Sequence, residues 1–321
     1  MKFNSFPIIA SASLVAAAVW FGQRRGRWDR TMASLKSELL REVNHPQRST
    51  KPHQSWEELP QPVQRYLQRI FSQYALPSSL TVPHTFSANL PVRSLRFKQK
   101  GIFRMNDRWF PFTARQLTSA LSQQPGFVWE ATVSLGPQGA WEKWWPTIEV
   151  LDAWTLGQGH LQAALFGVVP LVPVPESEQK DKLLLGEMLR WLAEASLVPT
   201  TLFPKQAVVT WKAVSEDKAL LQMKDPYTNK TVELTAIFDK DGWMTAVECS
   251  RHRAVGKDFV LTPWIGYVSK YEYIADVGMW IPMHMECGWI SDDGKEELYF
   301  KGDNVDLKYD IKSPKKATAT D

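Results

Sequence analysis

Residues 92–105 read VRSLRFKQKGIFRM, a stretch in which apolar and polar side chains alternate. With a period of two, the apolar side chains that share one face are Leu95, Phe97, Phe103 and Met105. The basic side chains that share the opposite face are Arg96, Lys98, Lys100 and Arg104. Such alternation is typical of an antiparallel strand with one face in the core and one face in solvent. We therefore predict a half-buried strand here.

The same period recurs along most of the chain that follows. Further alternating runs lie at about residues 127–135, 161–165, 207–214, 219–223, 231–238, 243–253, 268–274, 280–290 and 297–307. Turn signals such as Asp225-Pro226 and Asp241-Gly242 separate them. About ten antiparallel strands in succession predict an α+β fold built on one large, curved, half-barrel-like sheet.

One strong helix interrupts the strands. Residues 182–197 read KLLLGEMLRWLAEASL, which is apolar around most of the helix circumference, so we expect a buried helix on the concave face of the sheet. Glu187, Arg190 and Glu194 stand at helical spacing along one line of it. Buried charges need partners, and we expect Arg190 to pair with both glutamates.

The N-terminus carries an uncharged, largely apolar run from Phe3 to Phe21. Its length matches the hydrocarbon thickness of a bilayer, and no small-residue cleavage site follows, which favours an uncleaved transmembrane anchor at residues 1–22 over a signal peptide. The basic residues that follow it are Arg24, Arg25, Arg27 and Arg30. By the positive-inside rule, they favour a single-pass membrane protein whose C-terminal body is cytoplasmic, with the lipid bilayer as a partner.

The rest of the chain divides into three parts. Residues 23–54 are expected to form a basic amphipathic helix and a proline-containing linker, the helix having Met32, Leu35, Leu39 and Val43 on its apolar face. A second helix at residues 56–74 opens a single α+β domain over residues 55–308. Residues 309–321 are expected to be a disordered tail.

Composition and motifs exclude several functions. Residues 1–51 and 308–321 carry the excess of basic residues, so the body has more acidic than basic residues and is not expected to bind nucleic acid. The two cysteines, Cys249 and Cys287, cannot build a disulfide framework, although one bridge between them stays open. His284 and Glu286 lack a third metal ligand, and no nucleotide-binding or hydrolase motif is present. We therefore assign no catalytic residue, no metal and no cofactor.

Tryptophan is unusually frequent, with 15 residues in 321. Several of them fall in the strands expected around the buried helix, where indole rings could line a cavity for a hydrophobic ligand or fill an aromatic core. Together with the charged line on the helix, they give the expected ligand-binding residues, which are Trp129, Trp154, Glu187, Arg190, Glu194 and Trp211.

Several short segments carry a family resemblance. They are LPQPVQRYL at 59–67, GIFR at 101–104, WFPFTARQ at 109–116, GFVWEA at 126–131, residues 152–159 and GEMLRWLAE at 186–194. Through them the chain resembles an uncharacterised, mainly bacterial domain-of-unknown-function family with one N-terminal span and an R-[YW]-L-A-E helix. That resemblance implies no activity. The expected architecture is also similar to that of bacterial lipoprotein-carrier half-barrels, which is a likeness of fold alone.

These observations favour a membrane-tethered protein that binds a lipid-like or other hydrophobic ligand between sheet and helix; protein partners stay unknown. One alternative is a membrane-associated hydrolase or isomerase that uses Arg190 with Glu187 or Glu194. Another is a structural or assembly scaffold whose interior is simply full. A cavity would separate the first two from the third, and polar groups converging on it with access to water would favour the enzyme.

Overall fold

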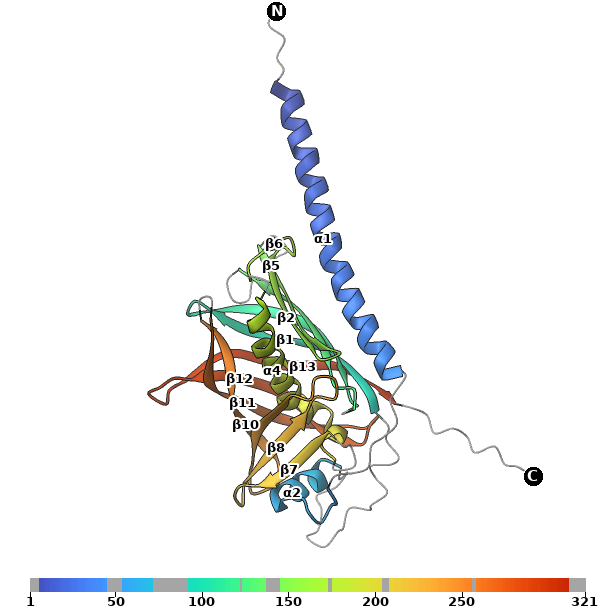
Figure 1. The fold of residues 1–321 in the computed structure, drawn as a ribbon, viewed down its shortest axis with the longest axis vertical. Coiled ribbons are helices and arrows are strands. Elements are labelled where there is room, and N and C mark those ends of the chain that lie inside the picture. The colour runs from blue at the N-terminus through green and yellow to red at the C-terminus, as the bar shows by residue number, and fades with distance from the viewer. Residues whose placement is uncertain are drawn as a thin grey trace, which may run out of the picture.

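A computed structural model describes residues 6–44, 54–71, 92–121, 123–136, 145–172, 175–203, 208–255 and 258–311, with the side chains of residues 6–17 left out. Its central element is one antiparallel sheet of 13 strands, with the order β6-β5-β4-β3-β2-β1-β13-β12-β11-β10-β9-β8-β7. The sheet curves around a helix, as Figure 1 shows. The predicted α+β half-barrel is confirmed.

The strands of the N-terminal half are β1 (Val92–Met105), β2 (Arg108–Ser119), β3 (Phe127–Ser134), β4 (Thr147–Thr155), β5 (Gln158–Leu165) and β6 (Val169–Pro170). Those of the C-terminal half are β7 (Val209–Ala213), β8 (Lys218–Lys224), β9 (Thr231–Phe238), β10 (Met244–Val255), β11 (Asp258–Ile274), β12 (Met279–Ile290) and β13 (Glu296–Ile311). The sequence had indicated only about ten strands, because β2 and β4 do not alternate cleanly and β6 has only two residues.

The two halves of the sheet meet where the first strand pairs with the last. In the register of β1 and β13, Gly101 lies opposite Gly302. A Cβ atom on Gly101 would lie 2.0 Å from the carbonyl oxygen of Lys301, so only glycine fits at this close approach. The pairing of β1 with β13, which joins the two halves of the sheet, therefore requires glycine at position 101.

Helix α4 (Ser177–Ala193) lies inside the curve of the sheet and continues into two short 3-10 turns, η1 (Glu194–Leu197) and η2 (Pro199–Leu202). It contacts β4 and β5 on one side and β9, β10 and β11 on the other. The predicted buried helix is thus confirmed. It starts five residues earlier than expected because Glu176 and Gln179 form a capping box.

Helix α2 (Gln61–Ile70) covers a second part of the concave face and contacts β8 and β12. Its apolar side, including the fully buried Tyr66, belongs to the same core as α4. The helix begins later than the predicted residue 56, because Pro60 and Pro62 confine the helix start to the positions around them. The predicted end at residues 72–74 lies outside the described residues.

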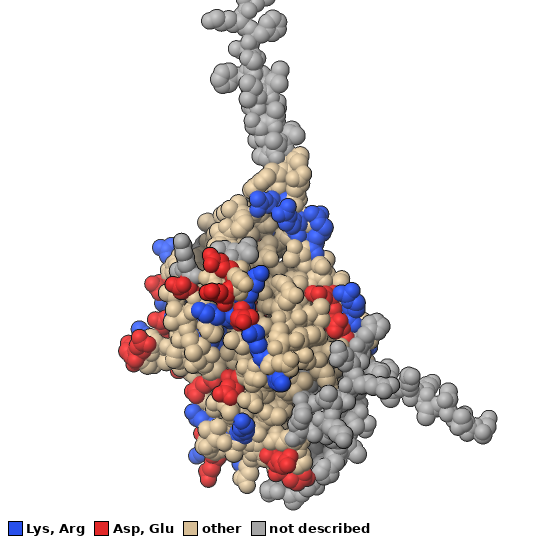
Figure 2. All heavy atoms as spheres, in the orientation of Figure 1, with Lys and Arg blue, Asp and Glu red and all other residues tan. Residues whose placement is uncertain are grey.

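Helix α1 (Phe6–Asn44) lies on the outer face of the sheet. The four apolar residues spaced along its second half are buried, and three of them, Met32, Leu35 and Leu39, form a cluster with Leu117, Val128, Leu151 and Ala153 of β2, β3 and β4. Lys36 Nζ also pairs with Glu130 Oε1 at 2.5 Å. Figure 2 shows basic side chains gathered where α1 leaves the barrel and mixed charges over the rest of that face.

In the part of the chain that the structure describes, no helix is both long enough and apolar enough to cross a membrane. The predicted anchor at residues 1–22 falls mostly on residues whose side chains are not described. Of the predicted tail at residues 309–321, residues 309–311 instead belong to β13, because they pair with β1, and residues 312–321 lie outside the described residues.

Candidate functional site

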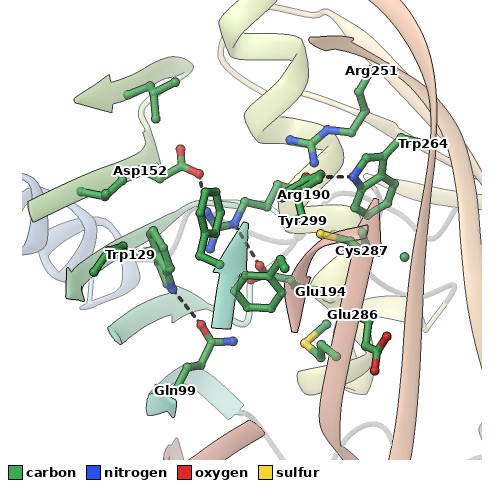
Figure 3. A pocket seen from close by; sticks show the side chains of 18 of the residues that line it. Gln99, Trp129, Asp152, Arg190, Glu194, Arg251, Trp264, Glu286, Cys287 and Tyr299 are labelled. Carbon is green, nitrogen blue, oxygen red and sulfur yellow. Dashed lines mark hydrogen bonds and ion pairs between the residues drawn. The ribbon is translucent and has the colours of Figure 1, made fainter. Parts of the chain in front are cut away.

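A cavity of about 430 Å³ lies between α4 and the concave face of the sheet (Figure 3). Most of its wall is apolar and is supplied by side chains from strands in both halves of the sheet, including Phe103, Met105, Val133, Ile148, Val150, Leu161, Ala163, Val268, Met285 and Phe300. The alternation of the strands explains this wall, because every second side chain points to the concave face. The volume falls in the range of small-molecule sites.

Arg190 is the centre of the polar part of the wall. Its Nε atom donates a hydrogen bond to Glu194 Oε1 at 2.9 Å, and its Nη1 atom pairs with Asp152 of β4. Gln116 completes the group, donating to Glu194 Oε2 at 2.6 Å and accepting from Arg190 Nη2 at 3.4 Å. The guanidinium also lies over the ring of Trp129, 4.7 Å from its centroid. The donors of Arg190 are thus engaged by protein groups on several sides.

The expected pairing of Arg190 with both helix glutamates is wrong for Glu187. Asp152 takes that place, because β4 brings its carboxylate to the cavity side of α4. Glu187 is 4% exposed, and its Oε2 atom has no hydrogen-bond partner among the described residues. Burial raises the pKa of Glu187 well above its usual value, and the negative charge of Asp152 raises it further. Glu187 is therefore biased towards the neutral, protonated form.

Opposed effects act on the pKa of Arg190. Burial by itself would lower it, but the carboxylates nearby, first Glu194 and then Asp152, outweigh burial and hold the pKa above its usual value. The guanidinium therefore stays charged inside the barrel.

A chain of hydrogen bonds between polar side chains runs across the sheet from the cavity wall. Trp129 Nε1 donates to Gln99 Oε1 at 2.7 Å, and Gln99 Nε2 donates to Asn304 Oδ1 at 2.8 Å. Asn304 in turn donates to the carbonyl oxygen of Pro282 at 3.2 Å. Such a satisfied network holds its members in one arrangement, which fixes the Trp129 ring in the cavity wall.

The structure brings three of the six predicted ligand-binding residues into the wall of the cavity: Trp129, Arg190 and Glu194. Trp154 lies in the core, edge to face with Trp191 at a centroid distance of 6.0 Å. Trp211 is also buried, and its Nε1 atom donates to the carbonyl oxygen of Leu202. Glu187 is not part of the wall, although it lies close enough to Asp152 for that carboxylate to raise the pKa of Glu187.

The sequence reasoning did not single out Arg251 as a site residue. This arginine of β10 lines the cavity, donates from Nη2 to the carbonyl oxygen of Gly186 at 2.8 Å, and lies over the Trp264 ring. Trp264 Nε1 donates to the hydroxyl of Tyr299 at 3.0 Å. The sequence did contain a sign of this role. Arg251 follows Val247 and Cys249 at a spacing of two, so it lies on the face of the strand that points into the core, where a charged residue is unusual.

The described residues offer no metal centre: no group of three or more His, Cys, Asp or Glu side chains among them could hold an ion. His284 instead binds Asp303 and Glu286 through its two ring nitrogens, at 2.7 and 3.0 Å. Cys249 and Cys287 are free thiols, and burial raises the pKa of each to about 11. Their neutral form suits the apolar surroundings.

Two solved structures resemble the fold weakly. A DUF1329 family protein from Desulfovibrio piger matches at 11% identity and a TM-score of 0.35, over 68% of this chain and 87% of that chain. A β-barrel-like protein of domain of unknown function DUF1849 from Brucella abortus matches at 9% identity and a TM-score of 0.28, over 70% of this chain and all of that chain. No curated protein matches the sequence.

A family model, in contrast, matches most of the chain. It describes a family of unknown function, DUF6920, and its match covers residues 57–309. Those residues include α2, the whole cavity wall and all but the end of β13. The chain therefore belongs to the DUF6920 family.

Proposed function

We propose that the half-barrel binds an apolar or amphipathic small molecule in the cavity between α4 and the sheet. The observation that carries this proposal is an apolar space of about 430 Å³ with a few fixed polar groups at one part of its wall. Protein cores are close-packed and contain few voids larger than a water molecule. An apolar space of this size is a poor site for water, so its filling by an apolar ligand is favourable.

The arrangement of the polar groups supports binding over catalysis. Arg190 is held by Asp152, Glu194 and Gln116, so it has little freedom to follow a changing charge on a substrate. Glu187 is not part of the cavity wall, which separates it from any bound molecule. The hydrolase or isomerase alternative, which uses Arg190 with Glu187 or Glu194, has less support from this geometry. The scaffold alternative does not explain an apolar cavity of this size.

We further propose that the protein is a single-pass membrane protein with the barrel on the cytoplasmic side. The support is the apolar run that ends at Phe21, the arginines that follow it, and the packing of the same helix on the outer face of the barrel. In this arrangement the cavity lies close to a bilayer that can supply hydrophobic molecules.

Photo-crosslinking tests the binding proposal on the full chain in detergent micelles. The probe is a long-chain alcohol that carries a diazirine, and the cross-linked peptides are mapped by mass spectrometry. We expect labelling of the segments that contain Phe103, Met105 and Met285, which line the cavity.

A pair of variants on β5 provides the control. Ala163 lines the cavity, whereas Gln162 is exposed on the same strand. Ala163→Phe is expected to reduce labelling of the cavity segments at least tenfold, because the added ring occupies the space, and Gln162→Phe to leave labelling unchanged. Equal labelling of the cavity segments in both variants and in the wild-type protein would contradict the proposal.

A further inference from the structure

Arg251 differs from Arg190, the other arginine in the cavity wall, in having no ionic partner in the part of the chain that the structure describes. Its side chain lines the cavity, yet among the described residues no carboxylate lies within ion-pair distance of its guanidinium. Within the described part of the chain, one hydrogen bond, from Nη2 to the carbonyl oxygen of Gly186, accounts for its contacts with acceptors, and its buried Nε atom has none. Arg190 in the same wall has two carboxylates. The cavity thus contains one neutralised and one unneutralised cation.

The groups that surround Arg251 do not supply the missing charge. Those that face it are Glu187, Tyr299, Cys249 and Cys287. Burial raises the pKa of both thiols to about 11, and it also raises the pKa of the Tyr299 hydroxyl above its usual value. The pKa of Glu187 is raised by burial and by Asp152, which favours its neutral form. An arginine, in contrast, keeps its proton in proteins.

A charged guanidinium in such surroundings is costly unless an anion joins it. The Trp264 ring, 5.0 Å from the Arg251 guanidinium carbon, supports one face of the group, and among the described residues its Nη1 atom has no hydrogen bond. Arginine N–H groups match the oxygen atoms of a carboxylate or a phosphate. Figure 3 shows Arg251, Trp264 and Tyr299 on one side of the cavity, with Asp152 and Trp129 on the opposite side. An anion at Arg251 would therefore lie away from the Asp152 carboxylate.

On the basis of the proposed function, we propose that Arg251 binds the oxyanion head group of an amphiphile whose acyl chain fills the apolar part of the cavity. The wall next to Arg251 supports this orientation, since Met285, Val268 and Phe300 offer an apolar surface to the chain. The head group would be a carboxylate, as in a fatty acid, or a phosphate, as in a phosphorylated lipid. Both accept paired hydrogen bonds from arginine.

Three diazirine probes with the same chain test this inference on the full chain in detergent micelles. One ends in a carboxylate, one in a phosphate monoester and one in an alcohol. We expect the wild-type protein to label its cavity segments at a concentration roughly tenfold lower with an anionic probe than with the alcohol, since hydrogen bonds to charged groups are the stronger ones. The anionic probe that labels at the lower concentration identifies the head group.

Two variants on one strand assign the effect to Arg251. Arg251→Gln is expected to remove the preference for anionic probes while the alcohol still labels the cavity, which also shows that the barrel is folded. Arg253→Gln is the matched control, because Arg253 lies two residues further on the same face, pairs with Glu297 and does not line the cavity. It should retain the full preference.

The outcomes separate this inference from the proposed function. Equal labelling of the wild-type cavity by anionic and neutral probes would overturn the role of Arg251 but leave the binding site intact. A preference for anionic probes that persists in Arg251→Gln would likewise overturn the role of Arg251 and leave the binding site intact. If no probe labels the cavity segments, the proposed function itself is wrong. Should Arg251→Gln not fold, Arg251→Lys replaces it, and a preference weaker than in the wild-type protein supports the inference, whereas an unchanged preference overturns it.

Discussion

Replacing Arg190 by methionine tests whether the charged group in the cavity wall is held as the structure describes. Arg190→Met keeps most of the aliphatic stem but removes the cation that binds Asp152 and Glu194. These two carboxylates have side chains only 14% and 16% exposed, so water cannot replace the lost partner fully. Breaking a buried ion pair by removing one partner costs about 3–5 kcal/mol. We expect the free energy of unfolding to fall by that amount at neutral pH.

Urea denaturation of the full chain, followed by tryptophan fluorescence, measures this change. The control is Arg104→Met, because Arg104 pairs with Asp107 at the surface, where the Asp107 side chain is 90% exposed. A surface pair contributes about 0–1 kcal/mol, so this variant should remain close to the wild-type protein.

A triple variant separates lost charge from lost packing. Asp152→Asn and Glu194→Gln, added to Arg190→Met, remove both stranded charges and should recover most of the lost stability. A change within about 0.5 kcal/mol for Arg190→Met alone would refute the reasoning, because it would mean that solvent accommodates the carboxylates. A triple variant no more stable than the single variant would show that the loss came from packing against Trp129 and Phe127.

The pKa of Glu187 is higher in the folded than in the unfolded chain, so the fold favours the protonated form of this carboxyl. The resulting stabilisation is complete below the unfolded-state pKa of about 4.3 and is lost as the pH rises through the folded-state pKa. In thermal melts, we therefore expect the melting temperature of Glu187→Gln to fall less with rising pH than that of the wild-type protein. The same dependence of melting temperature on pH in both proteins would contradict this prediction. Gly101→Ala should lower the free energy of unfolding by about 1–3 kcal/mol in urea titrations, since a Cβ atom there meets the Lys301 carbonyl oxygen, and an unchanged value would exclude that clash. Cys249 and Cys287 should react slowly with a disulfide reagent at pH 8 until urea unfolds the chain, because their pKa values are about 11; fast native labelling would show the thiols to be accessible.

The sequence predicted the fold class well, because alternation and helix amphipathicity act within one element. Strand β4 was missed since apolar residues occupy both of its faces. Leu151 and Ala153 pack under α1, while Val150 lines the cavity. With helices on both sides of the sheet, the strand has no solvent face and loses its period of two.

The candidate site was predictable only in part. The line of charges on α4 could be read from helical spacing, and two of its three members do lie in the cavity wall. The partner of Arg190 could not be read in this way. Asp152 and Arg190 are 38 residues apart and meet only because the sheet curves around the helix. Such a contact depends on how distant elements pack in three dimensions, which the hydrophobic period of a single element does not reveal.

Helix α1 has a mechanical consequence for the barrel. It is continuous over 39 residues, roughly 58 Å at the usual rise, and its second half is fixed to the sheet by residues such as Leu39 and Val128. The described backbone runs as one helix from Phe6 to Asn44. We therefore expect the packing of its second half on β3 and β4 to set the direction in which its first half projects from the sheet.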